Sequence, residues 1–200
     1  SPYKPLYVFV SHGHGDHFSA SIFNLAKKYP YVYYFMSKDI WEKRVPEELL
    51  ERTIFIGPDE RIGDSSLMIE TLQSTDDGVA FLIEIDGKAI YHAGDLNDWS
   101  WVNEPEDTNA WMRKNYRKEI AKLARKRLHA AFVVLDPRQE MEFAKGITWF
   151  LQHVEAAAVF PMHCWDDYSI ISRYKNLPES APYRNRICDI TAPGQSFWIR

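Results

Sequence analysis

The chain has 200 residues, of which 46% are hydrophobic and 26% charged, and its formal net charge is −4. That length allows one domain with a sizeable core but not two comfortable ones, and the balance of residues excludes a disordered chain. The negative charge argues against a protein that coats nucleic acid or an anionic membrane, and no apolar run is long enough to cross a bilayer.

The predicted elements of the N-terminal quarter alternate between strands and helices. A short apolar strand at residues 6–10 ends at a loop rich in glycine and histidine. Ser19 is a candidate N-cap for a helix that runs to about Lys28. A strand at 31–36 and a broken helix over 39–52 follow.

From residue 53 the hydrophobic period changes from helical to extended. Strands are predicted at 53–56, 67–73, 79–85 and 88–91, and Asp86-Gly87 forms a hairpin turn between the last two. The remaining expected elements are a long helix at 109–128, a strand at 130–135, a helix at 142–154, and strands at 156–162 and 195–199. This alternation predicts an α/β layered fold in a single domain over residues 1–200.

The loop after the first strand concentrates metal-binding side chains. Three histidines and an aspartate occur within six residues, as His12-x-His14-x-Asp16-His17. Imidazole and carboxylate groups are ligands of zinc, iron and manganese. Alternate residues of an extended loop point the same way, so His12 and His14 can bind one ion, whereas Asp16 and His17 can serve a second.

This motif after a strand resembles the signature of the metallo-β-lactamase superfamily. The resemblance implies an α/β (α+β) fold, a four-layer αββα sandwich with one or two metal ions at one edge. It also implies two later ligands at strand ends, a bridging Asp95 in IYHAGD and a final His163 in FPMH. The order and strand context match across about residues 6–165, and the closing turn into a last strand is also similar.

One departure from the family pattern bears on the first ion. The family usually has a histidine before a strand in a stretch resembling His-Thr-Pro-Gly, but here Ser74 stands at that position, in QSTDDGV. The first ion would keep His12, His14 and Asp95 and lose one nitrogen ligand, and Asp76 or a water would fill the place. The alternative is a single ion held by Asp16, His17, Asp95 and His163.

The N-terminus and the cysteines give two weaker indications. The family's opening β-hairpins are missing before Leu6, and the chain starts at Ser1 without an initiator Met, so we expect an N-terminal part to be missing. Cys164 and Cys188 cannot form a disulfide framework, which fits a reducing compartment. We therefore expect a cytoplasmic protein.

Metal chemistry indicates the reaction class. A divalent ion lowers the pKa of a bound water from about 16 to near 7, and the resulting hydroxide can attack an ester, lactone, amide or phosphodiester. Asp16 can orient or deprotonate that water as well as bind metal, which makes it the candidate catalytic residue. We therefore expect an enzyme, a metal-dependent hydrolase of small molecules that resembles the lactonase-like branch. Zinc is the expected ion, with manganese or iron as alternatives.

Aromatic and cationic side chains follow the predicted ligands. Trp99 and Trp101 come after Asp95, and Trp165 comes after the final histidine. Trp99 and Trp165 are candidates for a substrate wall, with ordinary packing as the alternative. Arg138, after the strand at 130–135, is a candidate ligand for an anionic group of the substrate or a partner in a surface salt bridge.

Two other functions stay open at this point. A basic run at 113–127 suggests a phosphodiesterase or nuclease, although a solvated helix face is the simpler interpretation. The run consists of Arg113, Lys114, Arg117, Lys118, Lys122, Arg125, Lys126 and Arg127, against Glu119 alone. The departure at Ser74 suggests a metal-binding module without turnover. We expect a small-molecule substrate and no membrane partner, and the sequence does not indicate an oligomeric state.

Overall fold

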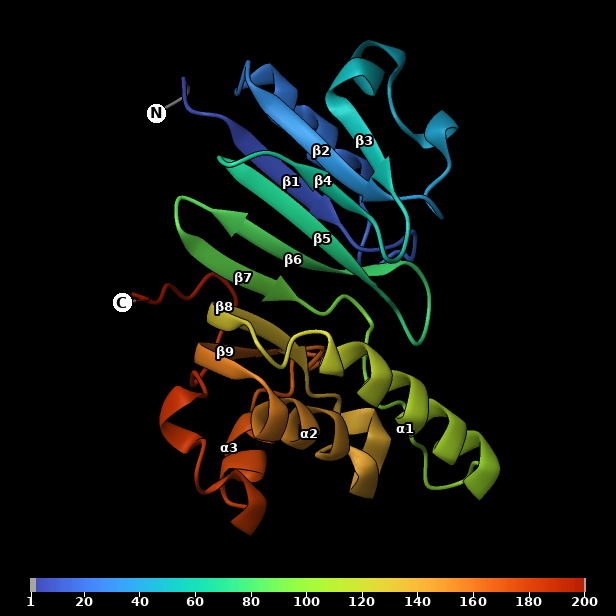
Figure 1. Cartoon of the computed structure of the whole chain (residues 1–200), viewed down its shortest axis with the longest axis vertical. Coiled ribbons are helices and arrows are strands. Elements are labelled where there is room, and N and C mark those ends of the chain that lie inside the picture. Colours follow the sequence, from blue (N-terminus) through green and yellow to red (C-terminus); the bar gives the residue numbers. More distant parts are fainter. Residues whose placement is uncertain (1–2, 200) are drawn as a thin grey trace.

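Two β-sheets lie face to face in the computed structural model, which describes residues 3–199 (Figure 1). The smaller sheet is parallel and has the order β1-β2-β3, with β1 at Leu6–Val10, β2 at Val32–Ser37 and β3 at Thr53–Ile56. The larger sheet has the order β4-β5-β6-β7-β8-β9. Its strands are β4 (Arg61–Gly63), β5 (Leu67–Gln73), β6 (Val79–Ile85), β7 (Lys88–His92), β8 (Arg127–Val134) and β9 (Glu155–Met162).

Helices cover the outer face of each sheet. The α-helices α1 (Glu106–Ala121), α2 (Lys145–His153) and α3 (Ser169–Lys175) lie beside the larger sheet (Figure 1). The smaller sheet carries the 3₁₀ helices η1 (Ala20–Lys27), η2 (Glu42–Arg44) and η3 (Glu47–Arg52). Three further 3₁₀ helices are η4 (Pro137–Glu142), η5 (Pro178–Ser180) and η6 (Arg184–Arg186).

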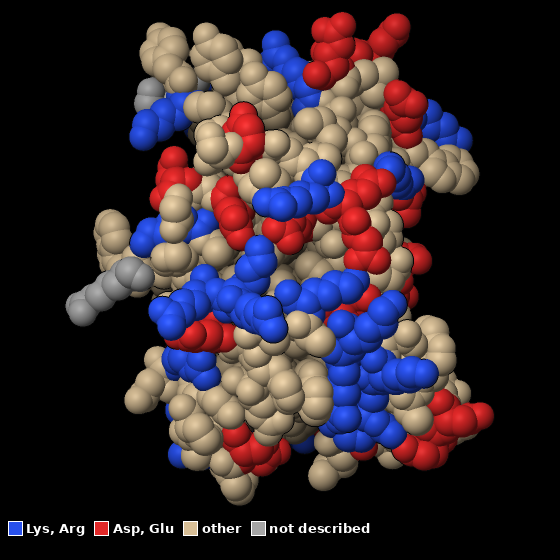
Figure 2. All heavy atoms as spheres, viewed as in Figure 1, with Lys and Arg blue, Asp and Glu red and all other residues tan. Residues whose placement is uncertain are grey.

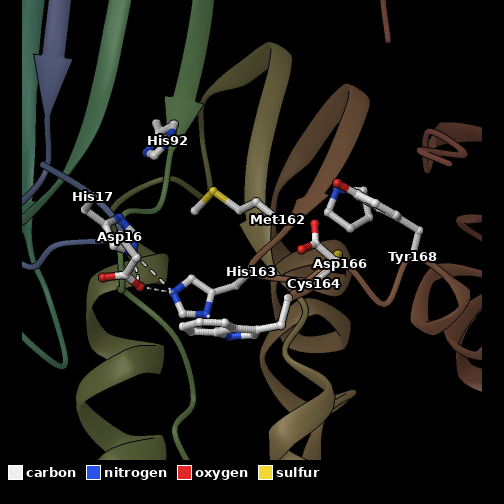
Figure 3. A pocket seen from close by; sticks show the side chains of 10 residues that line it. Asp16, His17, His92, Met162, His163, Cys164, Asp166 and Tyr168 are labelled. Atoms are coloured by element: carbon white, nitrogen blue, oxygen red, sulfur yellow. Dashed lines mark hydrogen bonds and ion pairs between the residues drawn. The ribbon is translucent and has the colours of Figure 1, made fainter. Parts of the chain in front are cut away.

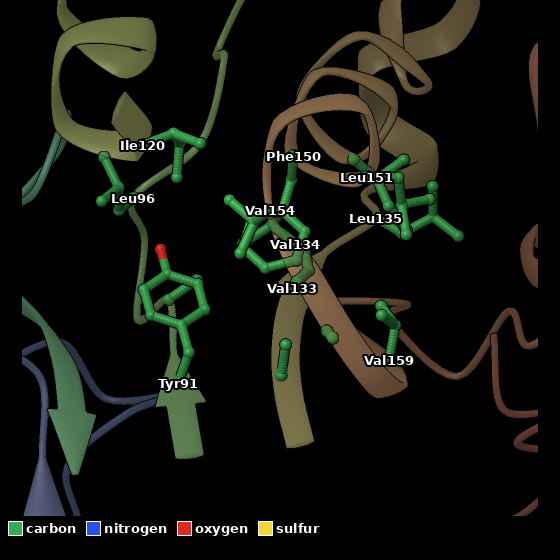
Figure 4. Close-up of a cluster of buried hydrophobic side chains, with 14 of the residues drawn as sticks. Tyr91, Leu96, Ile120, Val133, Val134, Leu135, Phe150, Leu151, Val154 and Val159 are labelled. Atoms are coloured by element: carbon green, nitrogen blue, oxygen red, sulfur yellow. The ribbon is translucent and has the colours of Figure 1, made fainter. Parts of the chain in front are cut away.

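Alternation along the strands divides the core into layers. On β1, Tyr7 and Phe9 pack between the sheets, whereas Val8 and Val10 pack under the 3₁₀ helices. Successive strand residues point to opposite faces, so one strand serves two cores. The largest cluster lies between the larger sheet and the α-helices, where the ring of Tyr91 stacks on Phe150 at 5.4 Å (Figure 4). The four layers confirm the predicted αββα sandwich.

The strand directions gather the site at one edge. Strands β7, β8 and β9 are parallel, so their carboxyl ends lie together. Asp95, Asp136 and His163 follow those three ends in turn. The loop after β1 and the turn between β5 and β6 meet at the same place, because Val79 donates its backbone N–H to the carbonyl of Ser11 at 2.9 Å.

Two predicted elements are wrong in the structure. The helix expected at 109–128 ends at Ala121, and Leu128 lies on β8, because Arg127 already pairs with Glu155 of β9. Strand pairing thus overrides a sequence of good helix formers. The strand expected at 195–199 is irregular, and only an isolated bridge of Ile187 reaches the β9 edge of the sheet.

Other expectations are met closely. Ser19 caps η1 by accepting the backbone N–H of Ser21, although the helix is 3₁₀ rather than α. The broken helix at 39–52 is present as η2 and η3, separated at Pro46. Both cysteines are free. Among residues 3–199 no helix has the length and apolar character to cross a membrane.

Gly78 provides a test of the close packing between these segments. Its φ is +72°, and a Cβ there would lie 2.0 Å from the carbonyl oxygen of Ser11 and 2.5 Å from Cβ of His12. We expect Gly78→Ala to lower the free energy of unfolding by well over the ~1–2 kcal/mol that a left-handed alanine costs by itself. Gly87→Ala is the matched control, because Gly87 has φ +70° and open space around it. Equal losses in urea unfolding of the two variants would contradict the close packing.

Candidate metal centre

The carboxylate of Asp95 lies at the middle of three histidines. Its side chain is 6% exposed, and its oxygens lie 3.1 Å from Nε2 of His17, 3.2 Å from Nε2 of His163 and 3.4 Å from Nε2 of His12. Figure 3 shows the imidazole of His163 turned toward Asp16 and His17. The structure therefore brings together residues that are up to 151 positions apart, counted from His12 to His163.

Three of these side chains, Asp16, His17 and His163, lie at the spacing of ligands around one metal ion. Nε2 of His17 and Nε2 of His163 are 3.2 Å apart, and Oδ2 of Asp16 lies 3.5 and 3.9 Å from them. Ligand atoms about 2.0–2.1 Å from a tetrahedral zinc are about 3.4 Å apart. Asp16, His17 and His163 therefore form one group whose ligand atoms lie within 4.8 Å of one another, and Asp95 approaches the Nε2 atoms of both histidines. This group fits one divalent ion.

Unpartnered buried atoms support the same conclusion. Among the described residues, Nε2 of His12 and Oδ1 of Asp95 are buried and have no hydrogen-bond partner, although the two side chains lie close together. Leaving such groups unpaired costs about 1–3 kcal/mol each. A cation that accepts their lone pairs would remove this cost, so the donor set fits a metal and not a simple polar cluster.

A second group of ligand atoms lies on the other side of Asp95. His14, Asp76 and Asp95 each offer an atom within 4.8 Å of the others. Ser74 is buried, and its hydroxyl accepts the backbone N–H of Asp76 at 3.1 Å, so it shapes the loop that carries Asp76. Asp76 therefore stands near the position at which the family pattern has a histidine. His14 also pairs with Asp77 at 3.0 Å.

Hydrogen-bond partners at Nδ1 orient the imidazole rings of the histidines. Asp136, fully buried after β8, lies 2.9 Å from Nδ1 of His163, which leaves Nε2 free to face Asp95. Ser11 lies 3.1 Å from Nδ1 of His12 and 3.4 Å from Nδ1 of His17. Such outer partners fix the ring orientation of metal ligands. Sequence reasoning missed the roles of Ser11 and Asp136, although both directly follow predicted strands.

The electrostatics of the cluster suit a cation. Burial alone would raise the pKa of Asp95, but His163 and His17 hold it well below its usual range. Burial alone would lower the pKa of His163, but the hydrogen bond with Asp136 and the negative charge of the neighbouring Asp95 raise it to about 9. Burial lowers the pKa of His12, which keeps its imidazole neutral and able to coordinate. Metal binding at His163 must therefore displace a proton.

Two cavities have His163 in their linings. One, of about 540 Å³, is lined by the predicted substrate residues Trp99, Arg138 and Trp165 together with Asp16, Asp76 and Asp95. The other, of about 530 Å³, is lined by Asp16, His17, His92, Met162, Cys164 and Tyr168 among others (Figure 3). His92, at the end of β7, thus lines a cavity beside the ligands. Burial raises the pKa of the Cys164 thiol to about 11, so it is not an activated nucleophile.

The fold is shared with solved proteins. No protein-family profile matches the sequence, and no curated protein matches it. The metallo-β-lactamase fold protein YhfI from Bacillus subtilis is 14% identical, with a TM-score of 0.53 over 84% of this chain and 70% of that one. The chain therefore has the metallo-β-lactamase fold. At this identity the likeness shows the fold and not the reaction.

Two other solved structures are similar over much of the chain. The diiron β-hydroxylase CmlA from Streptomyces venezuelae is 11% identical with a TM-score of 0.49, and the alignment covers 78% of this chain. Zn²⁺-bound PqqB from Methylobacterium extorquens is 14% identical with a TM-score of 0.47 over 84% of this chain. This chain spans only 35% of the length of CmlA and 66% of the length of PqqB.

The group around Asp76 predicts the behaviour of the first ion. We expect Asp76→Asn to weaken binding of one of two zinc ions by about tenfold or more, because an amide is a poorer ligand than a carboxylate. Asp86→Asn is the control, since Asp86 is exposed in the turn between β6 and β7 and belongs to none of the ligand groups of the described residues. Competition with a chromophoric chelator measures both ions. Equal affinities in wild type and Asp76→Asn would remove Asp76 from the site.

The raised pKa of His163 predicts the pH dependence of metal-free protein. The folded pKa of about 9 exceeds the ordinary value of 6.5, so protonated His163 stabilises the fold fully below about pH 6.5. That contribution is lost as the pH rises through about 9. We expect the stability difference between wild type and His163→Gln to fall by about 2–3 kcal/mol between about pH 6 and pH 9.5. Urea unfolding in the presence of a chelator measures it, and a difference independent of pH would contradict the assignment.

Proposed function

We propose that this protein is a metal-dependent hydrolase that cleaves an ester, a lactone or a related bond of a small molecule, with zinc as its ion. The observation that carries the proposal is the ligand group of Asp16, His17 and His163 beside the Asp95 carboxylate, because Asp16, Asp95 and His163 also line a cavity of about 540 Å³. Nitrogen and carboxylate ligands at this spacing suit zinc. A cavity of this size suits a small molecule.

The chain's own residues have definite parts in such a reaction. When bound, the ion would supply Lewis acidity and lower the pKa of water from about 16 to near 7. Asp16 lines both cavities and its side chain is 43% exposed, so its carboxylate can orient the attacking water and accept its proton. Water adds to the acyl carbon, the C–O bond breaks, and the leaving alcohol takes up the proton. Asp136 keeps the ring of His163 fixed throughout.

The nuclease alternative receives little support from the basic run. Arg113 pairs with Glu106, Arg127 lies 3.3 Å from Glu155, and the guanidinium of Arg117 lies over Trp149. Two lysines of the run are also paired: Lys122 with Asp59 and Glu119, and Lys126 with Glu70 and Glu84. Basic side chains form a band across this face, and acidic side chains border it (Figure 2). Paired cations have less charge to offer to phosphates.

A metal-binding module without turnover requires a different metal site from that of a hydrolase. A metal that only stabilises a fold is held in a closed shell of four protein ligands. Here Asp16 is exposed to two cavities, and His14 is half exposed. An open side of this kind supports access of a substrate to the ion.

The decisive experiment combines metal content with hydrolysis. We expect the purified protein to bind about two zinc ions per chain and to hydrolyse members of an ester and lactone panel. His163→Ala should lose one ion and at least about 100-fold in kcat/KM, because it removes one of the three ligands in the group of Asp16, His17 and His163. His153→Ala is the control, since His153 is exposed at the end of α2 and stacks on Trp149.

Each outcome separates the candidate functions. Turnover of phosphodiesters alone would favour the nuclease. One tightly bound ion without turnover of any substrate would favour the binding module. Activity that survives in His163→Ala as in His153→Ala would place the reaction elsewhere in the molecule.

A further inference from the structure

The cavity beside Asp95 has a specific shape and chemistry. It is lined by three tryptophans, Trp99, Trp101 and Trp165, and by one cation, Arg138. The three indoles come from two loops, one after β7 and one after β9. Core packing alone does not account for these aromatic rings beside the metal centre, because Trp165 remains 53% exposed.

Trp99 and Trp101 form a rigid aromatic wall. Trp99 is buried, and its indole N–H donates to the backbone carbonyl of Asp95 at 2.8 Å, which ties the ring to a metal-centre residue. Trp101 is nearly parallel to it, with an interplanar angle of 9° and centroids 6.0 Å apart. Flat rings in fixed positions favour a flat apolar group, since stacking contributes about 0.5–1.5 kcal/mol beyond area burial.

Arg138 forms the cationic corner of the same cavity. Its Nε and Nη2 bind the carboxylate of Asp136, with distances of 3.0 Å from Nε to each oxygen and 2.6 Å from Nη2 to Oδ2. Among the described residues, Nη1 has no hydrogen-bond partner, and the side chain is 49% exposed. The guanidinium also lies 4.3 Å from the ring of Trp165. The guanidinium is thus held by Asp136 through Nε and Nη2, and Nη1 is available to bind a ligand.

A fixed guanidinium is suited to binding an anion. The clamp by Asp136 removes much of the side-chain entropy that an arginine would otherwise lose on binding. Planar carboxylates match the remaining donors. Asp16, Asp76 and Asp136 lie around the same cavity or its arginine, so a group with a single negative charge meets less repulsion than a phosphate dianion.

We propose that the substrate is an aromatic carboxylate: a flat ring packs against the tryptophans, and a carboxylate binds Nη1 of Arg138. The hydrolysed bond then lies on the side of Asp95 and His163. This inference rests on the proposed hydrolase function, and it adds the chemical class of the substrate. Arg138 is the specificity-determining residue, and Trp101 positions the ring.

Equilibrium binding tests this assignment without turnover. The probe is naphthalene-2-sulfonate, a flat monoanion whose sulfonate is a poor metal ligand. Its matched partners are the neutral 2-naphthalenemethanol and the non-planar cyclohexanesulfonate. We expect calorimetry on the metal-loaded protein to give a Kd for naphthalene-2-sulfonate at least about tenfold lower than for either partner.

Variants then show which residue binds the sulfonate of the probe and which binds its ring. Arg138→Gln should lose at least about tenfold in affinity for naphthalene-2-sulfonate and leave 2-naphthalenemethanol unchanged, whereas Trp101→Leu should weaken both naphthalenes. Metal content of each variant shows whether the centre is intact. Arg173→Gln is the control, because Arg173 lies over Phe143 outside this cavity.

The outcomes separate this inference from the proposed function. Equal affinity for the charged and neutral naphthalenes, or undiminished sulfonate binding by Arg138→Gln, would overturn the aromatic carboxylate. Absence of binding by any probe would overturn it as well. The expected binding pattern without hydrolysis of any ester would leave the ligand class in place and refute the hydrolase.

Discussion

The rest of the site depends on one constraint, the burial of the Asp95 carboxylate among three imidazoles. Nε2 atoms from His12, His17 and His163 lie within 3.1–3.4 Å of its oxygens. Taking a carboxylate out of water costs several kcal/mol unless it is compensated. A proton on His163 compensates part of this in the metal-free protein, and a divalent ion would compensate all of it. The cluster therefore needs a positive charge, from a proton or a metal ion, to be stable. Its side chains must accordingly be held in place by the fold and not by contacts with one another.

The backbone around the site is shaped to hold those ligands. Gly94 has φ +54°, and a Cβ there would lie 2.7 Å from Cβ of Ser11, so the loop that ends in Asp95 packs directly on the loop that starts the histidine motif. His163 itself has φ +67°, an unusual conformation for a residue with a side chain. Its hydrogen bond to Asp136 offsets this strain and sets the direction of the ring. Strain of this kind persists where the surrounding contacts determine the conformation.

Much of this could be predicted from the sequence, and the reasons differ for each part. The clustering of the histidines and carboxylates was predictable because imidazoles and carboxylates at strand ends form a recognisable pattern, and strand alternation predicted the layers. The end of α1 was not, because the basic stretch after Ala121 favours helix locally, whereas β8 begins at Arg127 to pair with β9. The partners of the histidines at Nδ1 were also missed. Ser11 and Asp136 are ordinary residues in the sequence, and only the three-dimensional arrangement places them behind the rings.

In the proposed function, Asp136 would link metal binding to recognition of the substrate. One buried carboxylate binds Nδ1 of His163, the guanidinium of Arg138 and the indole N–H of Trp165 at 3.2 Å. The metal ligand and the anion-binding corner therefore cannot move independently. An anion at Arg138 would draw positive charge away from Asp136, which would leave that carboxylate a stronger acceptor for His163 and make its imidazole a more basic ligand. Occupation of the cationic corner by an anion would thus tighten the metal centre at the moment when the bond to be cleaved lies beside it.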